Sequence, residues 1–138
     1  MSRINEAVQL FENGHLCSQA VFEVFSEEFG LPASEAFKIG ACFGSGMRQG
    51  EVCGACTGAL MALGLKYGDD KTKCDEVSNE FFKEFKNENG SFICRDLLGC
   101  DISTPGGVAH AINNNLFKEL CPRMVASSVE ITEKIMEK

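Results

Sequence analysis

The sequence is short of tryptophan, tyrosine, proline and basic charge, and each shortage narrows what the protein can be. It has no Trp, one Tyr and three Pro, with 13 Lys and Arg against 20 Asp and Glu. The net charge of −7 excludes the basic surface that nucleic-acid binding requires. The longest apolar stretch without a charge, residues 52–65, is shorter than the roughly 18 residues of a membrane-spanning helix. We therefore expect no nucleic acid and no membrane among its partners.

We also expect no secretory leader, because residues 1–11 contain no continuous apolar segment. We therefore expect the protein in the cytoplasm. Its 138 residues suit a single domain, and at that size about two-thirds of the unfolded chain's surface can be buried. Eight cysteines in a cytoplasmic chain are more typical of metal ligands or redox groups than of structural disulfides. The composition predicts one helical, cysteine-rich redox domain over residues 1–138.

Hydrophobic residues recur at helical spacing along most of the chain, and no segment alternates as a β-strand would. Gly14, Gly30 and Gly90 stand where helical patterns end, and Thr104-Pro105 is typical of a helix start. We expect helices over residues 4–13, 17–29, 33–42, 53–67, 71–87, 104–120 and 121–136, with one further helical turn at 94–98. The pattern predicts an all-α fold, a compact bundle of about six or seven helices.

The stretch from Gly44 to Gly68 stands out because a glycine-rich turn runs into an apolar helix. The turn places Cys53 at the helix N-terminus, where free N–H groups and the helix dipole favour an anion. We therefore expect a lowered pKa for this thiol. Gly54 and Gly58 each cost about 0.5–1 kcal/mol relative to alanine inside a helix. They predict that another backbone or a bound group comes close to this helix.

Four cysteines share this position at a helix start: Cys17, Cys53, Cys94 and Cys121. Each therefore has a reason to be anionic, and converging helix N-termini would offset the repulsion between the thiolates. We expect these four residues to form one site, as the ligands of a metal ion or of an iron–sulfur cluster. The alternative is that the cysteines are small hydrophobic residues of the core.

Cys53 and Cys56 form a C-x-x-C pair, a spacing that suits a dithiol–disulfide couple or two ligands of one metal. As catalytic residues, Cys53 would be the attacking thiolate and Cys56 the resolving thiol. The chain has no second C-x-x-C at zinc-finger distance, so zinc is the less favoured cofactor. We expect Cys42 and Cys74 to pack in the core, and Cys100 to be unrelated to Cys94.

Three residues that can carry a positive charge lie near the cysteines in the sequence. Two of them have alternative interpretations, and the third would change the pKa of a neighbouring thiol. His15 is either a base or ligand close to Cys17, or a solvated loop residue. Arg48 either stabilises thiolates or is an ordinary loop arginine, and Arg95 would lower the pKa of the adjoining Cys94.

Taken together, the cysteine motifs resemble those of the redox-active family named after its C_GCAxxG_C_C pattern. The resemblance rests on Gly14-x-x-Cys17-Ser18-Gln19-Ala20-Val21, the turn at 43–50, Cys53-Gly54-Ala55-x-x-Gly58, Cys94-Arg95-Asp96-Leu97-Leu98-Gly99 and Cys121-Pro122. It implies a redox role, with Cys17, Cys53, Cys94 and Cys121 matching the four cysteine blocks. The family label is written Gly-Cys-Ala, whereas Cys53 here precedes its glycine and Cys56 is added. Cys53, Cys56 or both are therefore candidates for the chemistry.

These observations lead to two hypotheses on function. The first is a small cytoplasmic redox-active protein that uses clustered cysteines for electron transfer or thiol–disulfide exchange, with an iron–sulfur cluster as one form of the redox group. The second is a non-enzymatic helical module that binds zinc or another thiophilic ion. A redox partner protein is expected under the first hypothesis, and the apolar helix at 53–67 is long enough to cover a homodimer contact as well.

Overall fold

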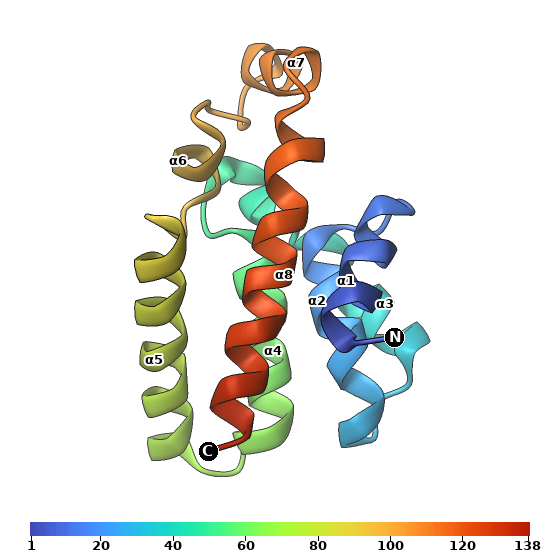
Figure 1. The fold of residues 1–138 in the computed structure, drawn as a ribbon, viewed down its shortest axis with the longest axis vertical. Helices are drawn as coiled ribbons and strands as arrows, with labels where there is room; N and C mark the ends of the chain where they lie inside the picture. The colour runs from blue at the N-terminus through green and yellow to red at the C-terminus, as the bar shows by residue number, and fades with distance from the viewer.

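The computed structural model describes all 138 residues and consists of eight α-helices without a β-strand (Figure 1). The predicted all-α fold is therefore confirmed. None of the helices combines the length and the apolar composition that crossing a membrane requires. The helices are α1 (Arg3–Glu12), α2 (Cys17–Ser26), α3 (Ala33–Ile39), α4 (Gly54–Tyr67), α5 (Lys71–Asn89), α6 (Cys94–Leu98), α7 (Pro105–Asn113) and α8 (Leu116–Met136).

Side-chain caps mark three of the helix starts. Ser2 accepts a hydrogen bond from the backbone N–H of Asn5 at the start of α1, and Asp70 does the same for Lys73 at the start of α5. Thr104 caps α7 by accepting from the N–H of Gly107, with proline in the first turn. Such caps satisfy N–H groups that have no partner inside the helix.

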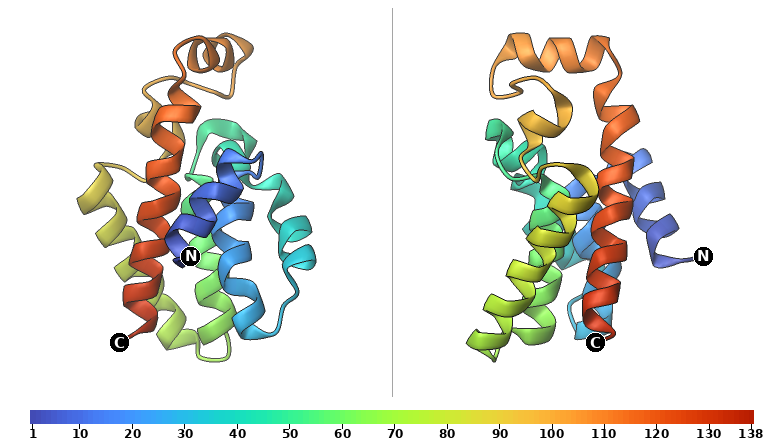
Figure 2. Two further views of the ribbon diagram at one scale, coloured as in Figure 1. Left: turned by 45° about the vertical axis from the view of Figure 1, so that its right-hand side comes forward. Right: turned by 60° about the vertical axis from the view of Figure 1, so that its left-hand side comes forward.

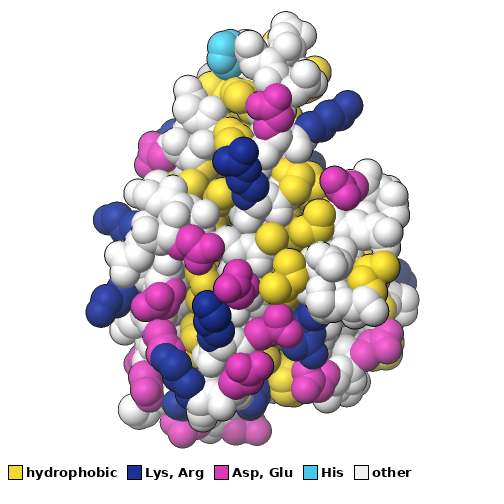
Figure 3. All heavy atoms as spheres, in the orientation of Figure 1, with side chains coloured by type: hydrophobic (Ala, Val, Ile, Leu, Met, Phe, Trp, Pro, Cys, Tyr) yellow, Lys and Arg dark blue, Asp and Glu magenta, His cyan; other side chains and the backbone are white.

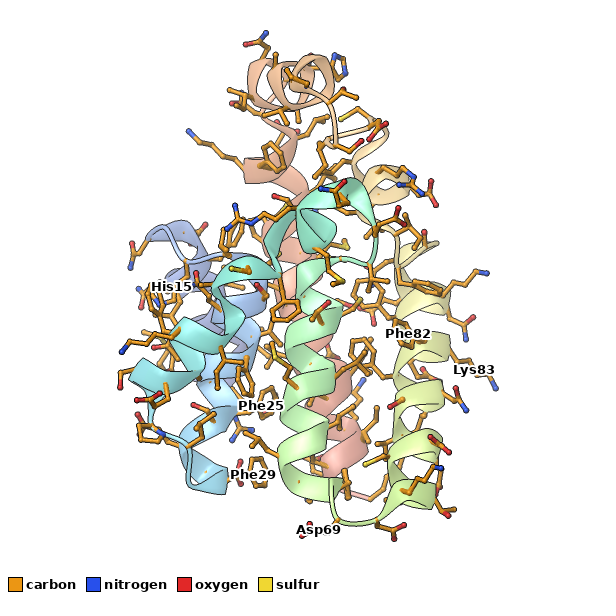
Figure 4. The ribbon with its side chains drawn as sticks, turned by 180° about the vertical axis from the view of Figure 1, so that it is seen from behind. His15, Phe25, Phe29, Asp69, Phe82 and Lys83 are labelled. Atoms are coloured by element: carbon orange, nitrogen blue, oxygen red, sulfur yellow. The ribbon has the colours of Figure 1, made fainter.

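Helix α4 lies at the centre of the bundle and packs against α2, α5 and α8. Seen from behind, α4 runs between α2 and α5, and Phe25 of α2 points toward it (Figure 4). Phe25, Phe81 and Phe85 are fully buried around it, and the last two rings stack with their centroids 5.8 Å apart. The cluster of buried residues that these rings join includes Cys17, Cys53 and Cys56, so the main core extends up to the cysteines.

The contact between α2 and α4 is close because α4 has no side chain at Gly58. A Cβ atom there would lie 2.7 Å from the carbonyl oxygen of Ser18 and 3.1 Å from the Cβ of Val21. The expectation that another backbone approaches this glycine is confirmed. The two helices touch at their backbones, and this fixes the spacing of the cysteines at their N-terminal ends.

The helix break near the C-terminus differs from the prediction. We expected a helix over 104–120 and a break at Cys121-Pro122, but the break falls at Asn114 and Asn115, and α8 continues through Pro122. Asn115 has φ 57°, a left-handed conformation that asparagine tolerates better than most residues. As a result α7 lies across the end of α8 (Figure 2).

The close contact at Gly58 gives a first prediction. Gly58→Ala should lower the free energy of unfolding by about 1–3 kcal/mol, because its methyl group has no room against α2. Gly64→Ala is the matched control on the same helix, since a Cβ at Gly64 would meet nothing within 4 Å. It should raise stability by up to about 1 kcal/mol through helix propensity. Urea unfolding of the reduced proteins measures both, and equal effects of the two changes would contradict the packing argument.

Candidate functional site

Four cysteines from four separate segments line one cavity of about 240 Å³. Cys17 comes from the start of α2, Cys53 from the residue before α4, Cys94 from the start of α6 and Cys121 from α8. The rest of the lining is almost entirely apolar, and consists of Phe11, Leu16, Ser45, Phe117 and Met124. In Figure 3, hydrophobic side chains are visible between the upper part of α8 and α1. The structure thus brings together the four cysteines that the sequence singled out.

The position of Cys17 follows from the two polar residues after it. The side-chain oxygen of Gln19 accepts a hydrogen bond from the backbone N–H of Leu16 at 2.8 Å, which caps the start of α2. The Ser18 hydroxyl donates to the carbonyl oxygen of Gly40, also at 2.8 Å. Both side chains are buried, so these bonds are shielded from water. The Cys-Ser-Gln motif therefore fixes both the helix start and the segment that leads to the glycine-rich turn.

Cys53 and Cys94 are held next to each other by a short antiparallel bridge between Val52 and Ile93. The backbone N–H of Cys53 donates to the carbonyl oxygen of Phe92 at 2.8 Å, and that of Cys94 donates to Glu51 at 2.6 Å. The chain enters α6 one residue after Ile93 and α4 two residues after Val52. The bridge thus sets the two sulfur atoms at one end of the bundle.

The glycine-rich turn has an unusual left-handed backbone. Ser45, Gly46, Met47 and Arg48 have φ angles of 53°, 62°, 57° and 65°. For the three residues other than glycine this costs roughly 1–2 kcal/mol each. The Arg48 side chain holds the turn by donating to the carbonyl oxygen of Ala41 at 2.8 Å. Of the two readings for Arg48, the structure therefore favours a structural role in the turn.

Two glycines let the turn and α4 come close to the cysteines. A Cβ on Gly46 would lie 2.9 Å from the Cβ of Cys94 and 2.5 Å from the backbone nitrogen of Glu51. A Cβ on Gly54 would lie only 2.6 Å from the sulfur of Cys17. The close approach predicted for Gly54 is confirmed, and the group that approaches is the sulfur atom of a cavity cysteine.

Cys17 and Cys53 are neighbours in the cavity wall, because the sulfur of Cys17 lies against Gly54, the residue that follows Cys53. The interaction with the Cys53 side chain raises the pKa of Cys17 well above its ordinary value, and burial and the charge of Cys53 add to the rise. Backbone N–H groups of Ser45 and Ser18 act in the opposite direction, by favouring the Cys17 thiolate. Two thiols from different helices thus sit within reach of each other.

The expected low pKa of Cys53 is wrong. The interaction with the Cys17 side chain lowers it, but the interaction with the Cys56 side chain, burial and the charge of Cys56 outweigh this, and the pKa lies well above its ordinary value. Only 6% of the residue surface is exposed, so the thiolate would lose its hydration. The favourable field of a helix start is therefore weaker than the cost of burial in an apolar cavity.

The same holds for the other two cavity cysteines. Burial raises the pKa of Cys94 to about 12, with smaller contributions from Cys17, Cys121 and Cys100. Burial also raises the pKa of Cys121 to about 12. Cys121 lies inside α8 rather than at a helix start, so the expected field of a helix N-terminus is absent there. The cavity therefore holds neutral thiols near neutral pH.

The remaining cysteines lie outside the cavity lining. Cys56 is fully buried behind Cys53 and contacts its side chain. Cys42 is exposed, so its predicted place in the core is wrong, and Cys74 is half-buried with its thiol donating to the carbonyl oxygen of Tyr67 at 3.1 Å. Cys100 packs against the small second core that contains Cys94, near α6 and α7.

Charged side chains near the cysteines pair with one another. Arg95 contacts Glu51 at 3.1 Å on the surface, and it does not set the pKa of Cys94. The Nε2 atom of His15 lies 2.9 Å from a carboxylate oxygen of Glu23, in an ion-pair contact whose angle is poor for a hydrogen bond. His15 lies in the loop between α1 and α2, as one of its two readings expected, and it is half-buried there.

Sequence reasoning missed the aromatic part of the cavity. Phe11 and Phe117 come from the end of α1 and the start of α8, and Met124 lies one turn after Cys121. Phe11 belongs to the apolar stripe of its helix, and this stripe reaches the turn before Cys17. That was the only feature of the sequence that could have placed Phe11 near the cavity. Nothing in the sequence distinguishes these residues from ordinary core residues.

Fold and cavity define a small all-α protein with a buried multi-cysteine site. A model of the family described as "Putative redox-active protein (C_GCAxxG_C_C)" matches residues 15–135. The chain therefore belongs to the C_GCAxxG_C_C family, whose description names redox activity. Comparisons with curated proteins and with solved structures gave no match.

The raised thiol pKa values predict how stability depends on pH. Cys94 and Cys121 titrate at about 12 in the folded protein, against about 8.5 in an unfolded chain. Between these values the folded state keeps protons that the unfolded state has lost. The free energy of unfolding should therefore fall as pH rises above about 8.5, by up to about 1.4 kcal/mol per pH unit for each thiol.

Anaerobic urea unfolding between about pH 8 and pH 10 measures this slope. Cys94→Ala should make the slope shallower, whereas Cys42→Ser, which changes an exposed thiol, should leave it as it is. Stability that is constant or rises over this range would show that the cavity thiols are already ionised.

Proposed function

We propose that the protein transfers electrons through its cavity cysteines, with Cys17 and Cys53 as a dithiol–disulfide pair. The observation that carries this proposal is that Cys17 and Cys53 line one cavity with two further cysteines, and that the Cys17 sulfur lies against Gly54, the residue after Cys53. Disulfide exchange needs two sulfur atoms that can meet without a large backbone movement. Membership of a family described as redox-active supports the same chemistry.

The reaction of this pair balances simply. When Cys17 and Cys53 form an S–S bond, the two thiols lose two electrons and two protons to an oxidised partner, and the reverse reaction restores both thiols. The interaction with Cys17 lowers the pKa of Cys53, whereas the interaction with Cys53 raises the pKa of Cys17. Of these two neutral thiols, Cys53 is therefore the one that loses its proton first and attacks, as the sequence suggested, with Cys17 as its resolving partner.

Cys56 is the other thiol within reach of Cys53. It lies one helical turn further along α4 and is fully buried, whereas Cys17 lines the cavity. A mixed disulfide on Cys53 is open to attack from the cavity side, and this favours Cys17. The C-x-x-C motif predicted Cys53 and Cys56 as the catalytic pair. This pair remains the alternative to Cys53 and Cys17.

A second candidate is an iron–sulfur cluster held by Cys17, Cys53, Cys94 and Cys121. The donor set fits, because thiolates are the usual ligands of such clusters, and the four sulfur atoms surround a cavity of about 240 Å³. The N–H groups of Ser45 and Ser18 face Cys17, and hydrogen bonds to sulfur tune the potential of a cluster. When bound, the cluster would supply one-electron transfer.

A single zinc ion fits the residues less well. Zinc requires sulfur atoms about 2.3 Å from one centre, and no group of three or more His, Cys, Asp or Glu side chains in the structure is arranged to hold a metal ion. We therefore propose the four cysteines as metal ligands only for an iron–sulfur cluster. The second hypothesis from the sequence, a helical module that binds zinc or another thiophilic ion, stays a prediction.

We also propose that the protein is located in the cytoplasm. We further propose that its surface contacts a redox partner protein or a second copy of the chain. All eight cysteines are free, which suits a reducing compartment. Phe37, Ile39 and Met47 are large apolar side chains that are between 42% and 51% exposed, and such residues are typical of contact surfaces.

The proposed pair is tested by thiol counting on the anaerobic protein through a cycle of oxidation and reduction. The wild-type protein should lose and regain two thiols reversibly, and both Cys17→Ser and Cys53→Ser should abolish the cycle. Cys74→Ser, which changes a half-buried cysteine outside the cavity, should leave it unchanged. Full cycling of the Cys17→Ser variant would instead support Cys53 and Cys56.

Iron and acid-labile sulfide analysis of the same oxygen-free preparations separates the cluster from the dithiol. Iron and sulfide that disappear in each of the four cavity variants, but not in Cys74→Ser, would assign the cluster. Absence of both from all preparations, together with reversible loss of two thiols, supports the dithiol.

A further inference from the structure

A second pocket, of about 480 Å³, adjoins the cysteine cavity, and both cavities are lined by Phe11 and Phe117. The two rings therefore stand between the sulfur atoms and this outer pocket. The outer pocket is large enough for a small organic ligand. A molecule in it would be separated from the cavity cysteines only by the edges of aromatic rings.

The sulfur atoms themselves are poorly accessible to a folded partner. Cys17, Cys53 and Cys94 are exposed by only 9%, 6% and 7%. A disulfide on the surface of another protein needs direct contact with the attacking sulfur, and the burial of these sulfur atoms restricts such contact to a partner segment that can enter the cavity. A small flat molecule can approach much more closely through the outer pocket.

The chemistry of the outer pocket narrows the class of ligand. Phe11, Phe117 and Pro122 offer flat apolar surfaces, and Lys118 and His15 supply polar groups beside them. Lys118 makes no ion pair, so its ammonium group is free to donate to a ligand oxygen. The second ring nitrogen of His15 is free as well, because the Glu23 carboxylate lies at Nε2.

This lining does not suit a nucleotide cofactor. Phosphate groups need several donors or cations, whereas the pocket has a single lysine and also contains the carboxylate of Glu12. An uncharged flat ring with oxygen atoms on its edge matches the aromatic faces and the ammonium donor of Lys118, and the hydroxyl groups of its reduced form can donate to the free Nδ1 of His15. Quinones have this form, and they take up two electrons and two protons.

We propose that the pocket formed by Phe11, His15, Phe117, Lys118 and Pro122 binds a quinone-type electron carrier next to the cysteine cavity. This inference rests on the proposed function, since it names the partner of the same redox site. As Cys17 and Cys53 form their S–S bond, they release two electrons and two protons, and the quinone takes up both to become the hydroquinone. No further reactant is required. His15 lies where it can pass a proton between the pocket and solvent.

The probe for this proposal is duroquinone, whose four ring methyl groups block addition of a thiol to the ring. Binding is measured by ligand-observed NMR on the Cys53→Ser variant, which cannot form the proposed pair and so does not consume the probe. Lys118→Met in this background should weaken binding of duroquinone by about 3–10-fold, the value of one hydrogen bond, and His15→Gln should weaken binding of the reduced form, durohydroquinone, by the same factor.

His110→Gln and Lys83→Met are the matched controls. Both residues are exposed and lie outside the pocket, and Lys83 points away from the bundle on α5, far from His15 (Figure 4). They should leave the affinity unchanged within twofold. Absence of saturable binding, or equal losses in pocket and control variants, would overturn the proposal.

A separate anaerobic reaction with the wild-type protein tests the electron transfer. One hydroquinone should form for every two thiols lost, and His15→Gln should slow the reaction while His110→Gln does not. Binding without any loss of thiols would overturn the dithiol function and leave the pocket assignment standing. Thiol cycling with other oxidants but no duroquinone binding would overturn only the quinone proposal.

Discussion

The close packing of α2 on α4 is the constraint on which the site depends. Gly58 lets the two helix backbones touch, and Gly54 leaves room for the sulfur of Cys17 above the first turn of α4. A side chain at either position would push the two helix starts apart and separate Cys17 from Cys53. The two glycines weaken α4 as a helix, by about 0.5–1 kcal/mol each, and this cost is understandable only because they bring two thiols together.

The rest of the fold brings two more cysteines to the same place. The bridge between Val52 and Ile93 sets Cys94 beside Cys53, and α8 crosses the open side with Cys121. The result is an apolar cavity in which ionisation of any thiol is unfavourable. Under the proposed function, neutral thiols in such a site hold the reducing electrons, and burial limits their reaction to small partners. Slow access and high thiol pKa values are two consequences of the same burial.

Much of the fold followed from local signals, and the failures have identifiable causes. Helical spacing and capping residues predicted most of the helices, because each signal acts within a few residues. The break at Asn115 was missed since apolar residues repeat every four positions across it, and Pro122 was read as a break although α8 continues through it. The positions of the cysteines at helix starts suggested that they form one site. The direction of the pKa shift at Cys53 could not be predicted, because it depends on burial, which is a property of the assembled core.

The proposed function depends on the positions of sulfur atoms, and these can be observed directly. Anomalous diffraction from sulfur in crystals of the reduced protein locates the sulfur atoms of every cysteine and methionine. We predict five sulfur peaks around a single cavity, four from Cys17, Cys53, Cys94 and Cys121 and one from Met124, with the peaks of Cys17 and Cys53 next to each other. Peaks of these four residues in separate parts of the molecule would contradict the account.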